Sequence, residues 1–253
     1  MLPGPDLVYK CPTCGSLLKN KSLMSGNTIG AILYSDAKQI ARMLPRYPNL
    51  TKCEKCNSIF WLSNLNVIGE CGWEANENPR EWNDAPYADF LNIKDLFRAL
   101  HENMDKDKEM SIRQDIWWSY NDRVRKDETL LDRLATWDRL ATWIIHSNDR
   151  VRKDETLKDE TLNEMLFEGE EDEKQWKENC ESMIKILNDI ARWWPFRRLN
   201  VGQKIMIAEL YRNLGQFEKC EKLINVLPSG YDWIKTQFME ECKKKNTYVF
   251  RLK

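Results

Sequence analysis

Two Cys-x-x-Cys pairs stand in the first quarter of the chain, at residues 11–14 and 53–56. We call them the first and the second knuckle. Two intervening residues let both sulfurs of a pair bind one ion, so two pairs supply the four thiolates of a tetrahedral zinc site. Such a site leaves no coordination position for water or substrate, which is typical of structural rather than catalytic zinc. We therefore predict a structural Zn²⁺ bound by Cys11, Cys14, Cys53 and Cys56.

The residues around each knuckle support this prediction. Gly15 and Asn57 follow the last cysteine of the two knuckles, and both residue types tolerate the left-handed conformation that closes such a turn. Four thiolates around Zn²⁺ carry a formal charge of about −2. We expect Lys10, Lys52 and Lys55, which flank the cysteines, to offset this charge. The alternative, two unrelated cysteine pairs, is less favoured because both spacings match.

Strands are predicted around the knuckles. Residues 28–34 and 39–44 flank a four-residue turn and indicate a β-hairpin, and residues 58–62 indicate a further strand. With its two knuckles and their strands, the segment of residues 6–70 resembles the zinc-ribbon family, in which the metal nucleates a small β-rich domain. The interval of 38 residues between the knuckles is longer than in minimal ribbons and has room for the extra hairpin.

Beyond the second knuckle the pattern becomes helical. Residues 71–90 are rich in Trp, Asn and Pro and are predicted as a linker that packs on the ribbon through its aromatic side chains. Cys71 lacks a partner at knuckle spacing, so we expect a small apolar filler rather than a fifth ligand. Apolar residues at helical spacing begin near Asn92, and Ser111 is predicted to cap a second helix. The acidic run at 168–173 is predicted as a loop and the first turn of another helix.

Identical segments recur in the middle of the chain. Residues 121–130 are repeated as 148–157, and residues 132–137 are repeated at once as 138–143. Residues 153–157 recur as 158–162. Structural repeats keep buried positions and let the surface change, whereas these copies keep every surface charge. A sequence-level duplication or an error in the assigned sequence therefore explains them better than a functional repeat array, and we expect no function for them.

The C-terminal stretch of residues 201–227 carries the small, aromatic and Gly-x-aromatic positions of a helix pair. Ala208, Tyr211, Gly215, Phe217 and Cys220 occupy them. With this pattern the stretch resembles one tetratricopeptide repeat, although a lysine stands at the usual early tryptophan and a cysteine replaces the second small alanine. The resemblance implies two antiparallel helices packed through the small residues. One repeat cannot bury its own face, so a helix pair that only packs and one that binds a peptide are equally compatible with the sequence.

Composition and motifs limit the classes of function. The net charge of −1 gives no general attraction to nucleic acid or to anionic membranes. The N-terminus lacks the features of a signal peptide and no apolar run is long enough to span a membrane, so we expect a cytoplasmic protein without membrane contact. Nucleotide-binding and hydrolase motifs are absent, and the two histidines stand outside metal or catalytic patterns. An enzyme therefore has no positive support.

These observations predict an α+β, mainly α fold, with a zinc-ribbon domain at 1–70, a linker at 71–90 and a helical domain at 91–253. This organisation resembles families of uncharacterised bacterial proteins with an N-terminal four-cysteine zinc ribbon and a tetratricopeptide-like C-terminus, which implies architecture but no activity. We expect a non-enzymatic protein-interaction or scaffold module with a protein partner. The alternative is a nucleic-acid-associated ribbon protein. It rests on the aromatic and basic side chains of residues 193–198 and on the lysines at 243–245.

Overall fold

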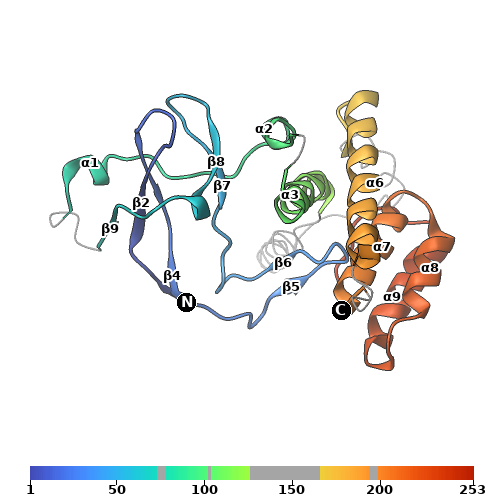
Figure 1. Ribbon diagram of the computed structural model, residues 1–253. Helices are drawn as coiled ribbons and strands as arrows, with labels where there is room; N and C mark the ends of the chain where they lie inside the picture. The colour runs from blue at the N-terminus through green and yellow to red at the C-terminus, as the bar shows by residue number, and fades with distance from the viewer. Residues whose placement is uncertain (73–77, 102–103, 126–165, 194–198) are drawn as a thin grey trace, which may run out of the picture. The chain divides into compact units, whose positions relative to one another are not determined.

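The computed structural model describes residues 1–72, 78–101, 104–125, 166–193 and 199–253 (Figure 1). The chain divides into two compact units. The N-terminal unit comprises Met1–Ile116 together with Arg251–Lys253, and the helical unit comprises Trp117–Phe250. Small antiparallel strands lie in the first and helices dominate the second, so the predicted α+β, mainly α class is confirmed. The predicted domain limits stay predictions.

The first knuckle is the turn of a hairpin in a three-stranded antiparallel sheet. Strand β2 (Asp6–Lys10) leads into it and β3 (Leu17–Asn20) leaves it. The two strands pair from Leu7 opposite Asn20 to Lys10 opposite Leu17. Strand β9 (Gly69–Cys71) pairs with the other edge of β2, which gives the order β3-β2-β9. The sheet thus fixes the two ends of the knuckle side by side.

The second knuckle is the turn of a second hairpin. Strand β7 (Leu50–Lys52) leads into it, and β8 (Ile59–Trp61) leaves it, with Lys52 opposite Ile59. The strand predicted at 58–62 is therefore confirmed. A short 3-10 helix, η1 (Leu62–Asn64), follows. Figure 1 shows the turns of the two hairpins next to each other at one end of the N-terminal unit.

The extra hairpin between the knuckles is present but short. It consists of β5 (Ile32–Leu33) and β6 (Gln39–Ile40), whereas whole strands were predicted at 28–34 and 39–44. The first half of the predicted strand is a turn instead, because the amide of Ala31 donates to the carbonyl of Thr28 and Gly30 has a φ of 70°. A further pair of strands is formed by β1 (Leu2–Pro3) and β4 (Leu23–Ser25).

The described part of the predicted linker contains a one-turn helix, α1 (Arg80–Asn83), that brings an aromatic ring onto the sheet. A Cβ atom added to Gly69 would lie 1.9 Å from the ring of Trp82, so this ring packs directly on the strand backbone. Further along, the amide of Ala88 donates to the carbonyl of Lys19 at 2.6 Å. Residues Lys19 and Tyr87 form a parallel bridge there, which extends the sheet at the β3 edge.

Two helices follow in the N-terminal half. Helix α2 (Ile93–Ala99) begins after Asn92, whose side chain accepts from the amide of Asp95 at 2.9 Å. Helix α3 runs over Lys106–Val124, so the prediction that Ser111 caps it is wrong. The carboxylate of Asp105 caps it instead, because it accepts from the amides at 107 and 108 and so starts the helix a turn and a half earlier.

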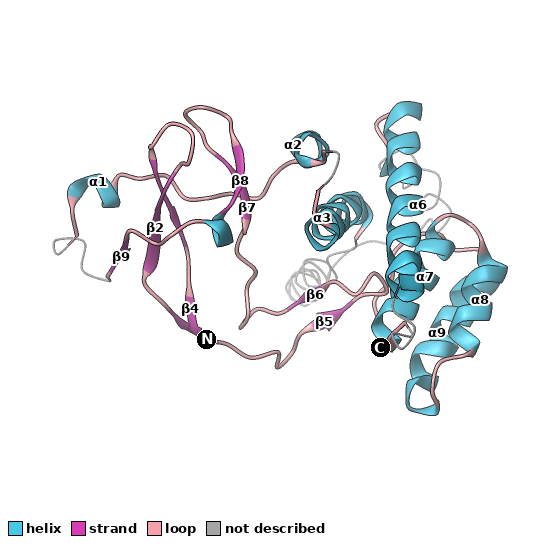
Figure 2. Ribbon diagram, in the orientation of Figure 1, coloured by secondary structure: helices cyan, strands magenta, loops and turns pink. Residues whose placement is uncertain are grey.

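The described part of the helical unit contains the end of α3, the helices α6 to α9 and a 3-10 turn (Figure 2). Helix α6 begins in the acidic run, as predicted, and four carboxylates occupy its first turn. Asn200 caps α7 in a reciprocal pair of hydrogen bonds with Gln203. The described elements after α3 are α6 (Glu170–Trp193), α7 (Val201–Asn213), α8 (Phe217–Asn225), η4 (Ser229–Tyr231) and α9 (Asp232–Lys243).

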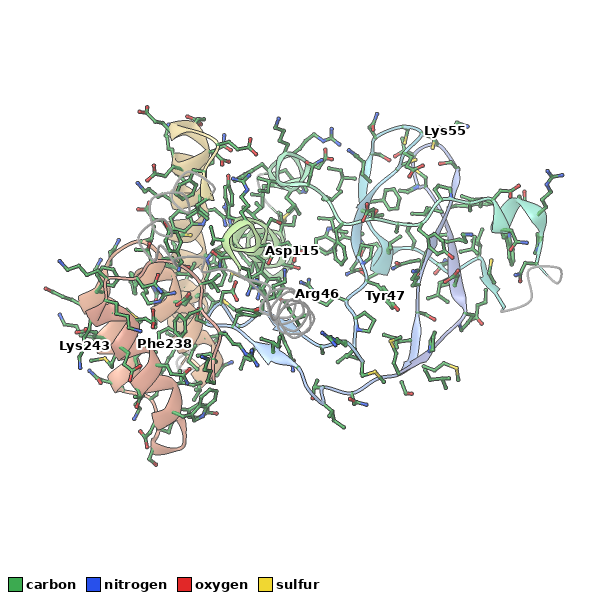
Figure 3. The ribbon with its side chains drawn as sticks, turned by 180° about the vertical axis from the view of Figure 1, so that it is seen from behind. Arg46, Tyr47, Lys55, Asp115, Phe238 and Lys243 are labelled. Carbon is green, nitrogen blue, oxygen red and sulfur yellow. The ribbon has the colours of Figure 1, made fainter. Side chains whose placement is uncertain are left out.

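Helices α7 and α8 pack against each other across a tight turn at Gly215, where φ is 70°. Ala208 and Cys220, the two small residues predicted to lie between them, are both fully buried. Helix α9 packs on α8, and its Phe238 (labelled in Figure 3) is also fully buried. The predicted helix pair is therefore present, with the expected small residues in its interior.

A buried ion pair joins α7 to the end of the helical unit. The guanidinium of Arg212 donates to both carboxylate oxygens of Glu209, at 2.8 and 2.5 Å, and both side chains are wholly shielded from solvent. The same guanidinium donates to the carbonyl of Tyr248 at 2.7 Å, while Asn213 donates to the carbonyl of Thr247 at 2.7 Å. The segment after α9 is thus fixed to α7 through its backbone.

Candidate metal centre

The two knuckles have the same backbone structure. In the first, the amide of Cys11 donates to the carbonyl of Ser16 at 2.8 Å, and the amide of Gly15 donates to the carbonyl of Cys11 at 2.9 Å. The second knuckle has the same two bonds, because the amide of Cys53 donates to the carbonyl of Ser58 and the amide of Asn57 donates to the carbonyl of Cys53, at 2.9 Å each. Gly15 and Asn57 have φ angles of 72° and 58°, the left-handed conformation that was predicted for them.

The four predicted cysteines come together at the tips of the hairpins. All four sulfur atoms lie within 4.8 Å of one another. Across the knuckles, the Sγ atoms of Cys11 and Cys56 are 3.6 Å apart, and those of Cys14 and Cys53 are 3.7 Å apart. A tetrahedron of sulfurs about 2.3 Å from a central zinc has edges of about 3.8 Å. The two distances across the knuckles are close to this edge length, and the four sulfurs are near enough to hold one metal ion.

One side of the centre is covered by a small apolar core. The cysteines at 11 and 53 are 2% and 5% exposed, while Cys14 is exposed. Below the sulfurs the core is formed by the side chains of Tyr9, Leu18, Phe60 and Leu62. These residues come from the strands and the 3-10 helix that flank the knuckles, so metal binding and packing of this core depend on the same backbone.

Hydrogen bonds stabilise the thiolate form of the two buried cysteines. Burial raises the pKa of Cys11, but the hydroxyl of Ser58 and the amides of residues 13 and 14 donate to its sulfur and lower the pKa to about 6. For Cys53 burial again raises the pKa, and the hydroxyl of Ser16 with the amides of residues 55 and 56 lowers it below its ordinary value. Both sulfurs are therefore prepared for the deprotonated state that a metal ligand requires.

The flanking lysines are arranged differently from the prediction. Lys52 binds the carboxylate of Asp95, which Arg98 also contacts at 3.3 Å, so its charge is directed to α2. Lys10 and Lys55 are exposed. Figure 3 shows Lys55 at the tip of the second knuckle, close to the yellow sulfur atoms. Their charges act on the centre from solvent, where screening is strong.

The sequence prediction missed two serines. The hydroxyl oxygen of Ser16 lies 3.1 Å from the sulfur of Cys14, and that of Ser58 lies 3.1 Å from the sulfur of Cys56. The signal was present in the sequence, because each serine stands two residues after the last cysteine of its knuckle. The repeated unit is therefore Cys-x-x-Cys-x-Ser rather than Cys-x-x-Cys alone.

The remaining cysteines are not members of the four-sulfur cluster. Cys71 is buried on β9, which agrees with the expected role as an apolar filler. Cys180, Cys220 and Cys242 are buried within the helical unit. Burial raises the pKa of Cys180 well above its usual range, as expected for an unreactive interior thiol.

Several predicted features fall on residues that the structure does not describe. The repeated segments lie almost entirely within residues 126–165, and residues 194–198 of the aromatic and basic stretch are also outside the described ranges. Lysines 243–245 stand at the end of α9. Within the described ranges, no helix is long and apolar enough to cross a membrane.

Two hairpins bring four cysteine sulfurs close enough together to hold a metal ion, and this cluster lies in an N-terminal unit of small antiparallel strands that precedes a helical unit. Comparisons with protein-family models, with curated proteins and with solved structures found no match to the chain.

Proposed function

We propose that the N-terminal unit is a zinc ribbon and that its zinc is structural. The supporting observation is the four-sulfur cluster, because four cysteine ligands are enough to fill every position of a tetrahedral zinc site. When bound, Zn²⁺ supplies a charge-dense cross-link between the two hairpins and no reactive water. The protein's own contribution is to hold four thiolates in place with backbone and side-chain hydrogen bonds.

We further propose that the whole chain is a non-enzymatic protein-interaction or scaffold module that acts in the cytoplasm. In this proposal zinc stabilises the N-terminal unit, and the helical unit contributes contact surface through a tetratricopeptide-like pair formed by α7 and α8. The support is the tight packing of this pair around two small residues and the extension of its face by α9. Helix pairs of this type bind peptide segments along their exposed faces.

The test of this function starts from the full chain as bait. Nuclease-treated cell extract is passed over it in 200 mM salt, and any captured protein is purified and tested for direct binding by calorimetry. We expect a defined complex that forms without nucleic acid. Capture of proteins from untreated extract but of none from the nuclease-treated extract would contradict the proposal, because it would place nucleic acid between the chain and its apparent partners.

A nucleic-acid-associated ribbon is the second candidate, and the N-terminal unit offers one observation in its favour. Tyr87 and Phe90 are about half exposed, and cations lie over both rings: Lys19 is 4.7 Å from the centre of Tyr87, and Arg46 is 6.0 Å from that of Phe90. Exposed rings next to basic groups can stack bases and bind phosphates. Against this candidate, Arg46 also pairs with Asp115 at 3.1 Å.

Fluorescence anisotropy with single-stranded DNA and RNA separates the two candidates. The interaction-module proposal expects weak binding that disappears between about 50 and 200 mM salt, the range over which purely ionic contacts are lost. Submicromolar binding at the higher salt, weakened by Tyr87→Ala and not by the matched exposed-aromatic control Trp233→Ala, would favour the nucleic-acid function.

A further inference from the structure

Each serine that follows a knuckle contacts both knuckles. The hydroxyl oxygen of Ser16 lies 3.1 Å from the sulfur of Cys14 in its own knuckle and 3.2 Å from the sulfur of Cys53 in the other. The hydroxyl oxygen of Ser58 lies 3.1 Å from Cys56 in its own knuckle and 3.4 Å from Cys11 in the other. Every sulfur of the centre therefore has one serine hydroxyl beside it.

The two serines make equivalent contacts, as the two knuckles do. Each one lies between the second cysteine of its own knuckle and the first cysteine of the opposite knuckle. The backbone carbonyls of the same two residues also accept the amide bonds that close the knuckles, from Cys11 and Cys53. Their positions are thus fixed by the turn structure, and the hydroxyls meet the sulfurs without a separate loop or helix.

The chemistry of the donors gives the direction of these bonds. A thiolate bound to zinc can only accept a hydrogen bond, whereas a serine hydroxyl carries one hydrogen that it can donate. Backbone amides already donate to the two buried sulfurs, but a four-thiolate zinc keeps a formal charge of about −2. Each serine hydroxyl lies 3.1–3.4 Å from two sulfurs and can donate its one hydrogen to either of them, so the two serines together reduce the charge on two sulfurs at a time. The side chain of Lys52 is bound to the carboxylate of Asp95 instead.

We propose that Ser16 and Ser58 are positioning residues of the metal centre, which donate hydrogen bonds across the interface between the two knuckles and so tighten metal binding. The inference rests on the proposed zinc site. It assigns to the serine of each Cys-x-x-Cys-x-Ser unit a role that the cysteines alone do not fill, and it predicts that the two serines act in equivalent ways.

The experiment compares the full chain with Ser16→Ala, Ser58→Ala and the double variant. Removal of a group that orients metal ligands typically weakens metal binding by about 10-fold to 100-fold. We expect a loss within this range for each single variant in zinc competition against a chelator, and a larger loss for the double variant. Ser16→Thr keeps the hydroxyl and should restore affinity. The control is Ser22→Ala, which removes a hydroxyl bond to the carbonyl of Pro5 elsewhere in the same unit.

A spectroscopic readout separates donation to sulfur from general stabilisation. In the Co²⁺-substituted protein, loss of a hydrogen bond raises the energy of the sulfur electrons, so the sulfur-to-cobalt charge-transfer band should move to longer wavelength in the alanine variants only. If the alanine variants keep both the affinity and the band of the parent protein, the serine inference is wrong. If the parent protein itself binds neither zinc nor cobalt, the proposed metal centre fails instead.

Discussion

At the scale of single residues, the four-sulfur cluster brings together groups that are unfavourable without a metal ion. Four thiolates close together repel one another, and burial of two of them adds a desolvation cost. A divalent ion offsets both effects, and hydrogen bonds from amides and hydroxyls reduce the remaining charge. The stability of the structure around the four knuckle cysteines should therefore depend on a bound metal ion, whereas that around the buried Cys71 should not.

Cys11→Ser should abolish stable zinc binding, because it removes one of the four sulfurs and leaves an incomplete ligand set. The two knuckle hairpins should then unfold, while the far-ultraviolet circular dichroism of the helices is largely retained. Cys71→Ala is the matched control and should keep one zinc per chain. Equal metal content in both variants would contradict the assignment of the ligands.

Asp172 carries a pH-dependent contribution within the helical unit. Burial raises the pKa of its carboxyl, but hydrogen bonds from Tyr120, at 2.6 Å, from the amide of Glu168 and from Arg123, at 2.6 Å, outweigh burial and lower it. A lowered pKa in the folded state means that the stabilisation is present above about pH 4 and is lost as the pH falls below that value.

Asp172→Asn should therefore destabilise the helical unit by about 1–3 kcal/mol at neutral pH, and the difference from the parent should shrink below about pH 4. Thermal unfolding followed at several pH values measures this. Glu170→Gln, an exposed carboxylate in the same helical turn, is the control and should have little effect. A difference between parent and Asp172→Asn that does not change with pH would refute the electrostatic explanation.

At the scale of elements, local signals predicted most of what the structure contains, and longer-range contacts account for the rest. The knuckles, β8 and the helix pair follow from cysteine spacing, alternating apolar residues and small residues at helical positions. The start of α3 was missed because Asp105 competes with Ser111 as a cap, and nothing in the local pattern ranks the two. The serine contacts depend on the approach of two hairpins far apart in sequence, which spacing within one knuckle does not reveal.

The α7–α8 pair should not tolerate a larger residue at its point of closest approach. Ala208 is wholly buried, so Ala208→Leu should overpack the pair and destabilise the helical unit by about 1–3 kcal/mol. Lys222→Leu adds an apolar side chain at an exposed position of α8 and serves as the control. Chemical denaturation followed by circular dichroism tests this, and equal stability of the two variants would contradict the packing.

The buried ion pair of α7 makes a further prediction for the segment after α9. Arg212→Met should destabilise the helical unit by about 3–5 kcal/mol, because it removes the counter-charge of the buried Glu209 along with the bond to the carbonyl of Tyr248. Amide exchange should show the greatest loss of protection in residues 246–250. Arg123→Met removes a partly exposed ion pair and should lower the free energy of unfolding by less than Arg212→Met does.

At the scale of the whole molecule, the two units are held together internally by different means. The N-terminal unit has short strands and a small core around the sulfurs, whereas the helical unit has long helices and many buried apolar side chains. Paired hairpins with strands this short and a core this small commonly need metal to remain folded. The helical unit has enough apolar burial to fold without it.

Removal of metal with a chelator should therefore produce selective unfolding. Amide exchange should rise to near the unprotected rate in β2, β3, β7 and β8 and stay slow in α7 and α8. Added zinc should restore the protection. Uniform loss of protection in both units would contradict the idea that zinc is needed by the N-terminal unit alone.

The most direct test of the central claim is the metal content and sulfur coordination of the full chain, purified without added metal. Elemental analysis and X-ray absorption at the zinc edge measure both quantities on one sample. We predict one zinc per chain with four sulfur neighbours at about 2.3 Å and no oxygen or nitrogen ligand. Protein without bound zinc, or zinc with fewer than four sulfurs, would contradict a closed structural site formed by Cys11, Cys14, Cys53 and Cys56.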